Sequence, residues 1–173
     1  VVVFEATPQA GGQVVLLTRS PRRREMIGII DWRVQQCEQA GVEFRFNTYA
    51  EADEILAENP DVVIIATGGL PDTEILRSGN ELVVSARDII AGDVAPGKNV
   101  LLYDDMADHP GMQAAEIIAE SGARLEYLSP ERQIAPDIGG TNLTPYMRKL
   151  LPLQVRFTLC RRALDARRVG DRI

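Results

Sequence analysis

The opening of the chain constrains its fold more than any other stretch. The apolar run Val1–Phe4 ends in an acidic residue, Glu5, and the pair Gly11-Gly12 with Gln13 follows soon after. An apolar strand that ends in a carboxylate and leads into glycines is typical of the second half of a dinucleotide-binding α/β unit. The glycine-rich phosphate loop of the first half is not among the 173 residues. We therefore expect the chain to be cut from a longer protein.

A second apolar stretch, Val62–Thr67, predicts the centre of a parallel sheet, because it is continuous and rich in β-branched residues. Between the two stretches, apolar residues three and four positions apart predict a helix that begins at Ser20-Pro21 and stops at Gly41. We also expect a strand at 42–46 and a short helix opened by a capping box, Thr48–Glu51. This alternation predicts an α/β fold with right-handed crossovers.

The second half of the chain repeats the alternation after a stretch, 70–97, that prolines and glycines interrupt. A unit of about 30 residues is expected there, followed by further elements. The predicted elements are strands at 99–103, 124–128 and 155–159, helices at 110–121 and 141–151, and a hairpin arm at 161–173.

These elements predict two Rossmann-like parallel-sheet lobes of the FAD/NAD(P)-binding type, the first of them incomplete. The expected boundaries are 1–72 for the partial FAD/ADP-binding lobe, 73–97 for a connection, and 98–173 for a second, degenerate NAD(P)-type lobe.

Three places in the first lobe are candidate cofactor contacts. Glu5 is placed to accept hydrogen bonds from ribose hydroxyls, although a carboxylate at a strand end can also be merely solvated. The segment Gly11, Gly12, Gln13 allows either close approach of a cofactor or a turn with positive φ. Ala66, Thr67 and Gly68 follow the predicted central strand, at the edge of the sheet where ligands bind in α/β folds.

In the second lobe, the loop after the first strand reads Asp104-Asp105-Met106-Ala107-Asp108-His109-Pro110-Gly111, where a nucleotide site would need Gly-x-Gly-x-x-Gly. Like charge at a helix amino terminus disfavours a phosphate, so we predict poor NAD(P)H binding by this lobe. A metal site in this loop is the less favoured alternative, and we assign none. His109 is the only histidine, which excludes a catalytic triad, and we expect it at the surface.

Composition narrows the class of protein. A net charge of −6 argues against nucleic acid as a partner, because binding phosphates requires a basic face. No apolar run approaches the ~20 residues of a membrane span, so we expect no membrane association. The basic run Arg22–Arg24 lies at a predicted helix amino terminus and is expected to be solvated, with a nearby anion such as a cofactor phosphate or an acidic face as the alternative. Cys37 and Cys160 are expected to be buried free thiols, which fits a cytoplasmic protein.

The order of these motifs resembles one family. Val-Val-Val-Phe-Glu-Ala at the start, Ile-Asp-Trp-Arg at 30–33, Gly-Val-Glu-Phe-Arg-Phe-Asn-Thr at 41–48 and Asp-Val-Val-Ile-Ile-Ala-Thr-Gly-Gly at 61–69 carry the resemblance. They resemble the carboxyl-terminal region of the large NADH:flavin oxidoreductases built on an old-yellow-enzyme barrel. That family includes trimethylamine dehydrogenase, 2,4-dienoyl-CoA reductase and demethylases of N-methylated amino acids.

The resemblance implies cofactors and roles. It implies FMN and a [4Fe-4S] cluster in parts of the enzyme outside this sequence, and FAD or ADP in the first lobe. It places Glu5 and Gly11–Gln13 at the adenosine and Ala66–Gly68 at the pyrophosphate. It assigns no catalytic residue to this chain, and we expect the chain alone to bind no cofactor firmly.

The degenerate loop at 104–111 favours an amine or N-methyl amino acid dehydrogenase that passes electrons to an electron-transfer flavoprotein or a similar carrier. An NAD(P)H-dependent enoate or dienoyl-CoA reductase is one alternative. A cofactor-free α/β assembly module is another. We also expect a homo-oligomer, since an exposed sheet edge can pair with another chain.

Overall fold

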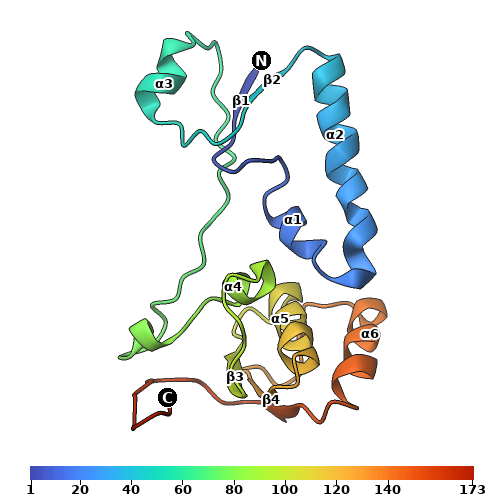
Figure 1. Ribbon diagram of the computed structural model, residues 1–173, viewed down its shortest axis with the longest axis vertical. Coiled ribbons are helices and arrows are strands. Elements are labelled where there is room, and N and C mark those ends of the chain that lie inside the picture. The colour runs from blue at the N-terminus through green and yellow to red at the C-terminus, as the bar shows by residue number, and fades with distance from the viewer. The chain divides into compact units, whose positions relative to one another are not determined.

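The computed structural model describes residues 1–173 and separates them into two compact units, Val1–Gly69 and Leu70–Ile173. Figure 1 shows the elements of both units along the chain. Each unit is an α/β arrangement with its own parallel sheet, of two strands in the first and three in the second. The predicted fold class is therefore confirmed. The exact lobe boundaries at 72 and 97 stay a prediction.

The sheet of the first unit pairs β1 (Val2–Phe4) with β2 (Glu43–Arg45) in parallel, with Val3 opposite Phe44. The connection between them contains α1 (Gln13–Leu17), a 3₁₀ helix η1 (Pro21–Ile27) and α2 (Gly28–Gln39). Ser20 precedes Pro21 at the start of η1, so the predicted helix begins as a 3₁₀ turn and continues as α2. Parallel pairing of β1 and β2 requires such a crossover.

The expected apolar face of this helix is confirmed. Ile27, Ile30, Val34 and Cys37 are each half-buried, whereas the other residues from Gly28 to Ala40 are exposed. After α2, Gly41 has φ of +72°, a conformation that glycine adopts without steric cost. The predicted stop at Gly41 therefore has its physical cause in the turn that leads into β2.

The helix α3 (Ala52–Ala57) begins one turn later than the predicted capping box implies. The box is formed by Glu51 and Glu54, and the Glu51 amide donates to Glu54 Oε2 at 3.1 Å. Thr48 lies four residues before Ala52, the first residue of α3, which is too far upstream to cap this helix, and its hydroxyl donates to the Phe46 carbonyl at 3.2 Å. The prediction of Thr48 as the cap was wrong for this reason.

The predicted central strand at 62–67 does not form. Residues 60–75 make no backbone–backbone hydrogen bond, and Ile64 and Ile65 are 84% and 82% exposed. A β-strand is stable only when a neighbouring strand accepts and donates along its length. The sheet of the first unit consists of β1 and β2 alone, and neither pairs with this segment.

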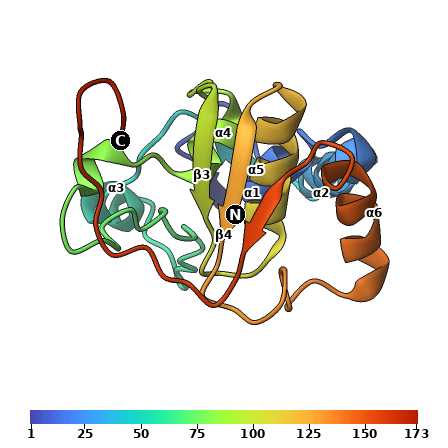
Figure 2. The same ribbon diagram turned by 90° about the horizontal axis from the view of Figure 1, so that it is seen from below.

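The second unit contains a parallel sheet in the order β3-β4-β5, formed by Asn99–Tyr103, Arg124–Leu128 and Arg156–Thr158. Figure 2 shows these strands side by side. The crossovers are α5 (His109–Glu120) and α6 (Gly140–Leu150), and α5 packs on β3 and β4. All three predicted strands and both predicted helices are present, with shifts of one or two residues at some ends. Helix α6 is capped by Gly139 rather than by Thr141-Asn142.

The core of the second unit lies between α5, the sheet and α6. Its fully buried large side chains are Met112, Ile118, Tyr127, Tyr146 and Leu150. Burying one such aliphatic side chain contributes roughly 1.5–3 kcal/mol, so these few residues supply much of the stability of the unit. The predicted buried side of α5 is confirmed, because Met112, Ala115, Ile118 and Ala119 are all buried.

The segment 70–97 belongs to the second unit and contains η2 (Asn80–Leu82) and α4 (Ala86–Ala91), which contacts α5. It meets the end of the chain, because the Arg77 amide donates to the Leu164 carbonyl at 2.8 Å and the Ala166 amide to the Ser78 carbonyl at 3.0 Å. The expected hairpin arm at 161–173 is reduced to isolated bridges, one of which joins Val169 to Arg172.

Candidate functional site

Glu5 lies at the carboxyl end of β1, where its backbone is fixed to the strand beside it. Its amide donates to the Arg45 carbonyl at 3.0 Å, and its carbonyl accepts from the Thr48 amide at 3.0 Å. These two hydrogen bonds extend the β1–β2 ladder by one residue. The Glu5 side chain therefore extends from a fixed position at the carboxyl edge of a parallel sheet, where ligands bind in α/β folds.

The Glu5 side chain is held by the turn that follows it. Oε1 accepts from the Thr7 amide and from the Thr7 hydroxyl, both at 2.8 Å. The Thr7 hydroxyl is also 2.7 Å from the Gln9 carbonyl. The two hydrogen bonds to Oε1 fix the direction of the carboxylate, while Oε2 makes neither of these bonds. A carboxylate fixed in this way can accept a hydrogen bond from a ligand hydroxyl.

Different structural features explain why each of the two positions in the predicted cofactor segment is a glycine. Gly11 has φ of +125°, and a Cβ at this position would overlap Ile30 Cδ1 on α2. Gly12 has φ of +49° and nothing near its would-be Cβ, and it precedes the first residue of α1, Gln13. The close approach at Gly11 is thus to a helix of the same unit, and the positive φ at both positions fits the turn interpretation.

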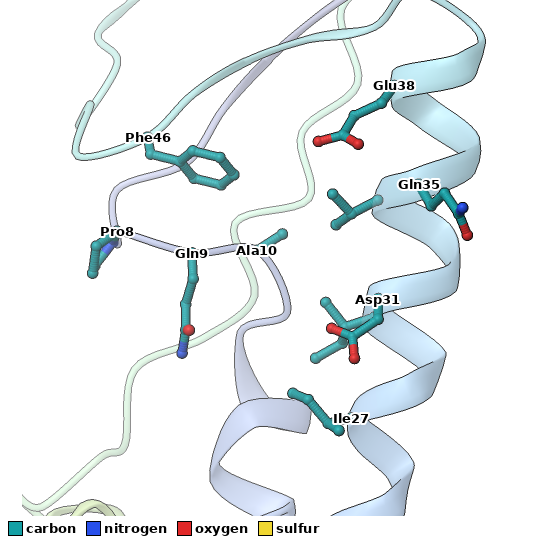
Figure 3. A pocket seen from close by; sticks show the side chains of 10 residues that line it. Pro8, Gln9, Ala10, Ile27, Asp31, Gln35, Glu38 and Phe46 are labelled. Carbon is teal, nitrogen blue, oxygen red and sulfur yellow. The ribbon is translucent and has the colours of Figure 1, made fainter.

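A cavity of about 420 Å³ lies between this turn and α2. Figure 3 shows Pro8, Gln9, Ala10 and Phe46 on one side of it and the α2 side chains on the other. The α2 wall combines apolar side chains with Asp31, Gln35 and Glu38. Two carboxylates disfavour a phosphate there, so the cavity suits an uncharged group with apolar surface and a few hydrogen-bonding atoms.

The sequence did not reveal this cavity as a site. The half-buried α2 positions, Ile30 and Val34, are read from periodicity as ordinary core residues. Ile30 and Val34 also line a second, smaller cavity of about 350 Å³, together with Gly11 and Cys37. A helix face that lines a cavity has the same apolar periodicity as a helix face packed in the core, so only the structure distinguishes the two.

Ala66, Thr67 and Gly68 lie in the exposed, extended stretch that follows α3. Gly68 has φ of +70°, and nothing lies within 4 Å of its would-be Cβ. No backbone hydrogen bond joins these residues to Glu5 or to the turn at 11–13. The structure thus brings Glu5 and Gly11–Gln13 onto one connection of the first unit, and no backbone hydrogen bond joins Ala66–Gly68 to them.

The loop between β3 and α5 is built around a buried carboxylate. Asp104 is 5% exposed, and its Oδ2 accepts from the Tyr127 hydroxyl at 2.5 Å. Its Oδ1 accepts from the amides of Met106 and Ala107 at 3.2 and 3.0 Å. Burial raises the pKa of Asp104 above its ordinary value, and the three donors oppose that rise. Burial, followed by the hydrogen bond to Asp104, raises the pKa of Tyr127.

The other two carboxylates of the loop behave differently. Asp105 is exposed, whereas Asp108 is half-buried and its Oδ1 accepts from the His109 amide at 2.6 Å. No group of three or more histidine, cysteine or acidic side chains is placed to hold a metal ion. His109 is half-buried, with Nδ1 3.4 Å from the Tyr146 hydroxyl, so the expectation of a surface residue was wrong. The first turn of α5 brings its ring against α6.

The remaining predictions concern the cysteines and membrane association. Cys37 is half-buried and Cys160 is exposed, and both are free thiols. Burial of Cys160 was predicted from its apolar neighbours, but it lies in a turn with φ of +55° after β5. None of the helices is long and apolar enough to cross a membrane.

Comparison with known proteins gives several relatives, although no family model matches the chain. A probable N-methylproline demethylase of Rhizobium meliloti is 58% identical over 173 residues, 100% of this chain and 26% of that protein. An N,N-dimethylglycine/sarcosine dehydrogenase of Chromohalobacter salexigens is 36% identical over 91% of this chain and 24% of that protein. A multifunctional alkene reductase/demethylase OYE of Caballeronia cordobensis is 37% identical over 81% of this chain and 21% of that protein.

A solved complex of 2-naphthoyl-CoA reductase has the same fold. It matches 96% of this chain with a TM-score of 0.85 and 29% identity, and the match covers 25% of the reductase chain. The chain thus spans about a quarter of the length of the proteins it matches. These matches confirm the resemblance to the NADH:flavin oxidoreductase family of old-yellow-enzyme-like enzymes.

Proposed function

We propose that the chain is the nucleotide-binding part of an enzyme that oxidises N-methylated amino acids and passes the electrons to a carrier. The observation that carries the proposal is the 58% identity with a probable N-methylproline demethylase, which extends over all 173 residues. The similarity to a dimethylglycine/sarcosine dehydrogenase supports the same substrate class. In such a reaction the N-methyl carbon loses two electrons and a proton, equivalent to a hydride, which the flavin of the intact enzyme would accept.

In this proposal the first unit binds the adenosine part of FAD or ADP. Glu5 Oε2 accepts a hydrogen bond from a ribose hydroxyl, because Oε1 already accepts hydrogen bonds from Thr7. The turn Gly11–Gln13 lies along the adenosine, and Ala66–Gly68 lies at the pyrophosphate. The exposed amides of Ala66–Gly68 and the absence of a side chain at Gly68 fit a phosphate. FMN and a [4Fe-4S] cluster belong to the remainder of the enzyme, and the chain alone holds no cofactor firmly.

The carrier is an electron-transfer flavoprotein or a similar protein, and the enzyme is a cytoplasmic homo-oligomer. Two free cysteines agree with a reducing compartment. The exposed segment with Ile64 and Ile65 is an apolar surface that needs a cover in the assembled enzyme.

A second candidate function is reduction of an enoate or dienoyl-CoA by NAD(P)H. The similarity to an alkene reductase/demethylase and to 2-naphthoyl-CoA reductase favours it. The two functions differ in the source of electrons, an amine in the first and a pyridine nucleotide in the second. The acidic loop at Asp104 favours the amine as the source of electrons over a pyridine nucleotide. A cofactor-free assembly module is the third candidate, supported only by the exposed segment at 62–65.

Anaerobic reduction of the flavin in the intact enzyme tests the proposal. With N-methylproline or sarcosine we expect rapid bleaching of the flavin absorbance, and with NADPH at the same concentration slow or no bleaching. Fast bleaching by NADPH without any by the methylated amino acids would establish the reductase function instead. Purified intact protein that contains no flavin would favour the assembly module.

A further inference from the structure

We propose that Asp104 is a specificity-determining residue. Its carboxylate occupies the position at the amino end of α5 where the pyrophosphate of a pyridine dinucleotide would bind, and it thereby excludes NAD(P)H from the second unit. The inference rests on the proposed function, since it explains why the enzyme takes electrons from an amine. It assigns the exclusion to one buried side chain rather than to the summed charge of three carboxylates.

Asp104 lies where the phosphates of a dinucleotide would bind in a parallel α/β unit. It is the residue directly after β3, and α5 begins at His109. In parallel α/β sheets, ligands bind beyond the carboxyl ends of the strands, and phosphates bind at the amino ends of the following helices. Asp104 therefore stands at the point of the second unit where a dinucleotide phosphate is expected.

Asp104 also takes up the hydrogen-bond donors of the loop. A phosphate in such a loop is bound by backbone amides, and here the amides of Met106 and Ala107 donate to Asp104 Oδ1. The Tyr127 hydroxyl, from the adjacent strand β4, donates to Oδ2. The loop amides are thus already engaged with an internal anion. An incoming phosphate would have to displace it and leave a buried carboxylate without donors.

The Asp104 carboxylate also fills the space beside the first turn of α5. A Cβ on Gly111, in the first turn of α5, would overlap the Asp104 carboxylate, so the carboxylate lies directly against the backbone of the helix. The loop around it is tightly folded, because Ala107 is 3% exposed and has φ of +57°. The Ala107 carbonyl accepts a hydrogen bond from the Asp137 amide at 3.3 Å. No room for a second anion remains between Asp104 and the helix.

Asp105 and Asp108 do not have this role. Asp105 is exposed, and Asp108 turns its carboxylate to the His109 amide at the helix start. Exposed charges are screened by salt and weaken phosphate binding only modestly. Asp105 therefore serves as a control position in the same loop.

The test is NADH binding to the intact enzyme, followed by hydrogen–deuterium exchange of the peptide that covers 104–111. We expect no protection of this peptide by NADH in the wild type, in Y127F or in D105N, because each retains Asp104. In D104G we expect protection and a Kd for NADH at least tenfold lower than in the wild type. D104N keeps the size of the side chain without its charge, so we expect a gain of a few-fold.

Two results would overturn the inference. One is protection of 104–111 by NADH in the wild type at the affinity measured for D104G. The other is a folded D104G that binds NADH no more tightly than the wild type. If D104G does not fold, an unchanged Kd in D104N overturns the inference in the same way. Reduction by N-methylproline is measured on the same samples, so failure of the proposed substrate shows separately from the NADH result.

Discussion

Removal of the Tyr127 hydroxyl tests whether the buried Asp104 pair stabilises the second unit. The hydroxyl donates to Asp104 Oδ2 at 2.5 Å, Tyr127 is fully buried, and Asp104 is nearly so. A hydrogen bond to a charged group contributes about 1.5–3 kcal/mol net. In Y127F the carboxylate keeps only its two amide donors, so we expect a loss of about 2 kcal/mol in the free energy of unfolding at pH 7. For a chain of this length, that loss corresponds to a decrease in Tm of about 6 °C.

The assay is urea unfolding of the wild type, Y127F and a control, Y103F. Tyr103 lies in the same sheet, is half-buried, and its hydroxyl makes no hydrogen bond in the structure, so we expect Y103F to stay within about 0.5 kcal/mol of the wild type. In a D104N background the acceptor is neutral, and the cost of Y127F should fall to about 1 kcal/mol. A Y127F variant as stable as Y103F would refute the assignment of the hydrogen bond.

Three further predictions follow from single contacts. Burial raises the pKa of Asp104 above its ordinary 3.8, so the folded state binds this proton more tightly than the unfolded state. The contribution of protonated Asp104 to the free energy of unfolding is present below pH 3.8 and declines as the pH rises through the folded pKa. Urea unfolding at several pH values measures it, and the same pH profile in the wild type and in D104N would contradict the prediction. G79A should lower the free energy of unfolding by about 3 kcal/mol, because its Cβ would overlap the Ala166 carbonyl and its φ is +84°. G122A has the same φ but open space around its Cβ, so it should lower the free energy by about 1 kcal/mol, as measured by thermal unfolding. Equal costs for the two variants would refute the contact at Ala166. E5Q should lower the affinity of the intact enzyme for ADP about tenfold, measured by calorimetry, because the amide replaces a charged acceptor; an unchanged affinity would remove Glu5 from the site.

Elements whose pattern is complete within the segment could be predicted from the sequence. The strand β4 was predicted at Arg124–Leu128, and the structure places it there. The buried side of α5 follows from apolar residues three and four apart, a period that any α-helix imposes. Glu5 at the end of β1 follows from the strand pattern and the acidic residue that closes it.

Features that depend on distant residues could not be predicted in this way. The β-branched run at 62–67 predicts a strand, but a strand also needs a neighbour, and β1 and β2 pair only with each other. Asp104, Asp105 and Asp108 look alike as three acidic loop residues. Only the approach of Tyr127, from the next strand, shows that Asp104 is the internal one.

The turn at Gly11 gives a further example. Two adjacent glycines are compatible with a cofactor contact or with a turn, and both demand the same residue type. The structure shows Ile30 in the space that a Cβ of Gly11 would need, thirty residues into the chain and on another element. The packing of α2 therefore gives this glycine a structural reason independent of any ligand.

The proposed function requires that the first unit binds a nucleotide in the intact enzyme and that the second does not. Analysis of the nucleotides released on acid denaturation of the intact enzyme tests it most directly. We expect an adenosine nucleotide, ADP or FAD, in equal amount to the polypeptide, with no NAD(P)H. The amount should be lower in E5Q and unchanged in D105N. Release of NAD(P)H, or of no adenosine nucleotide at all, would contradict it.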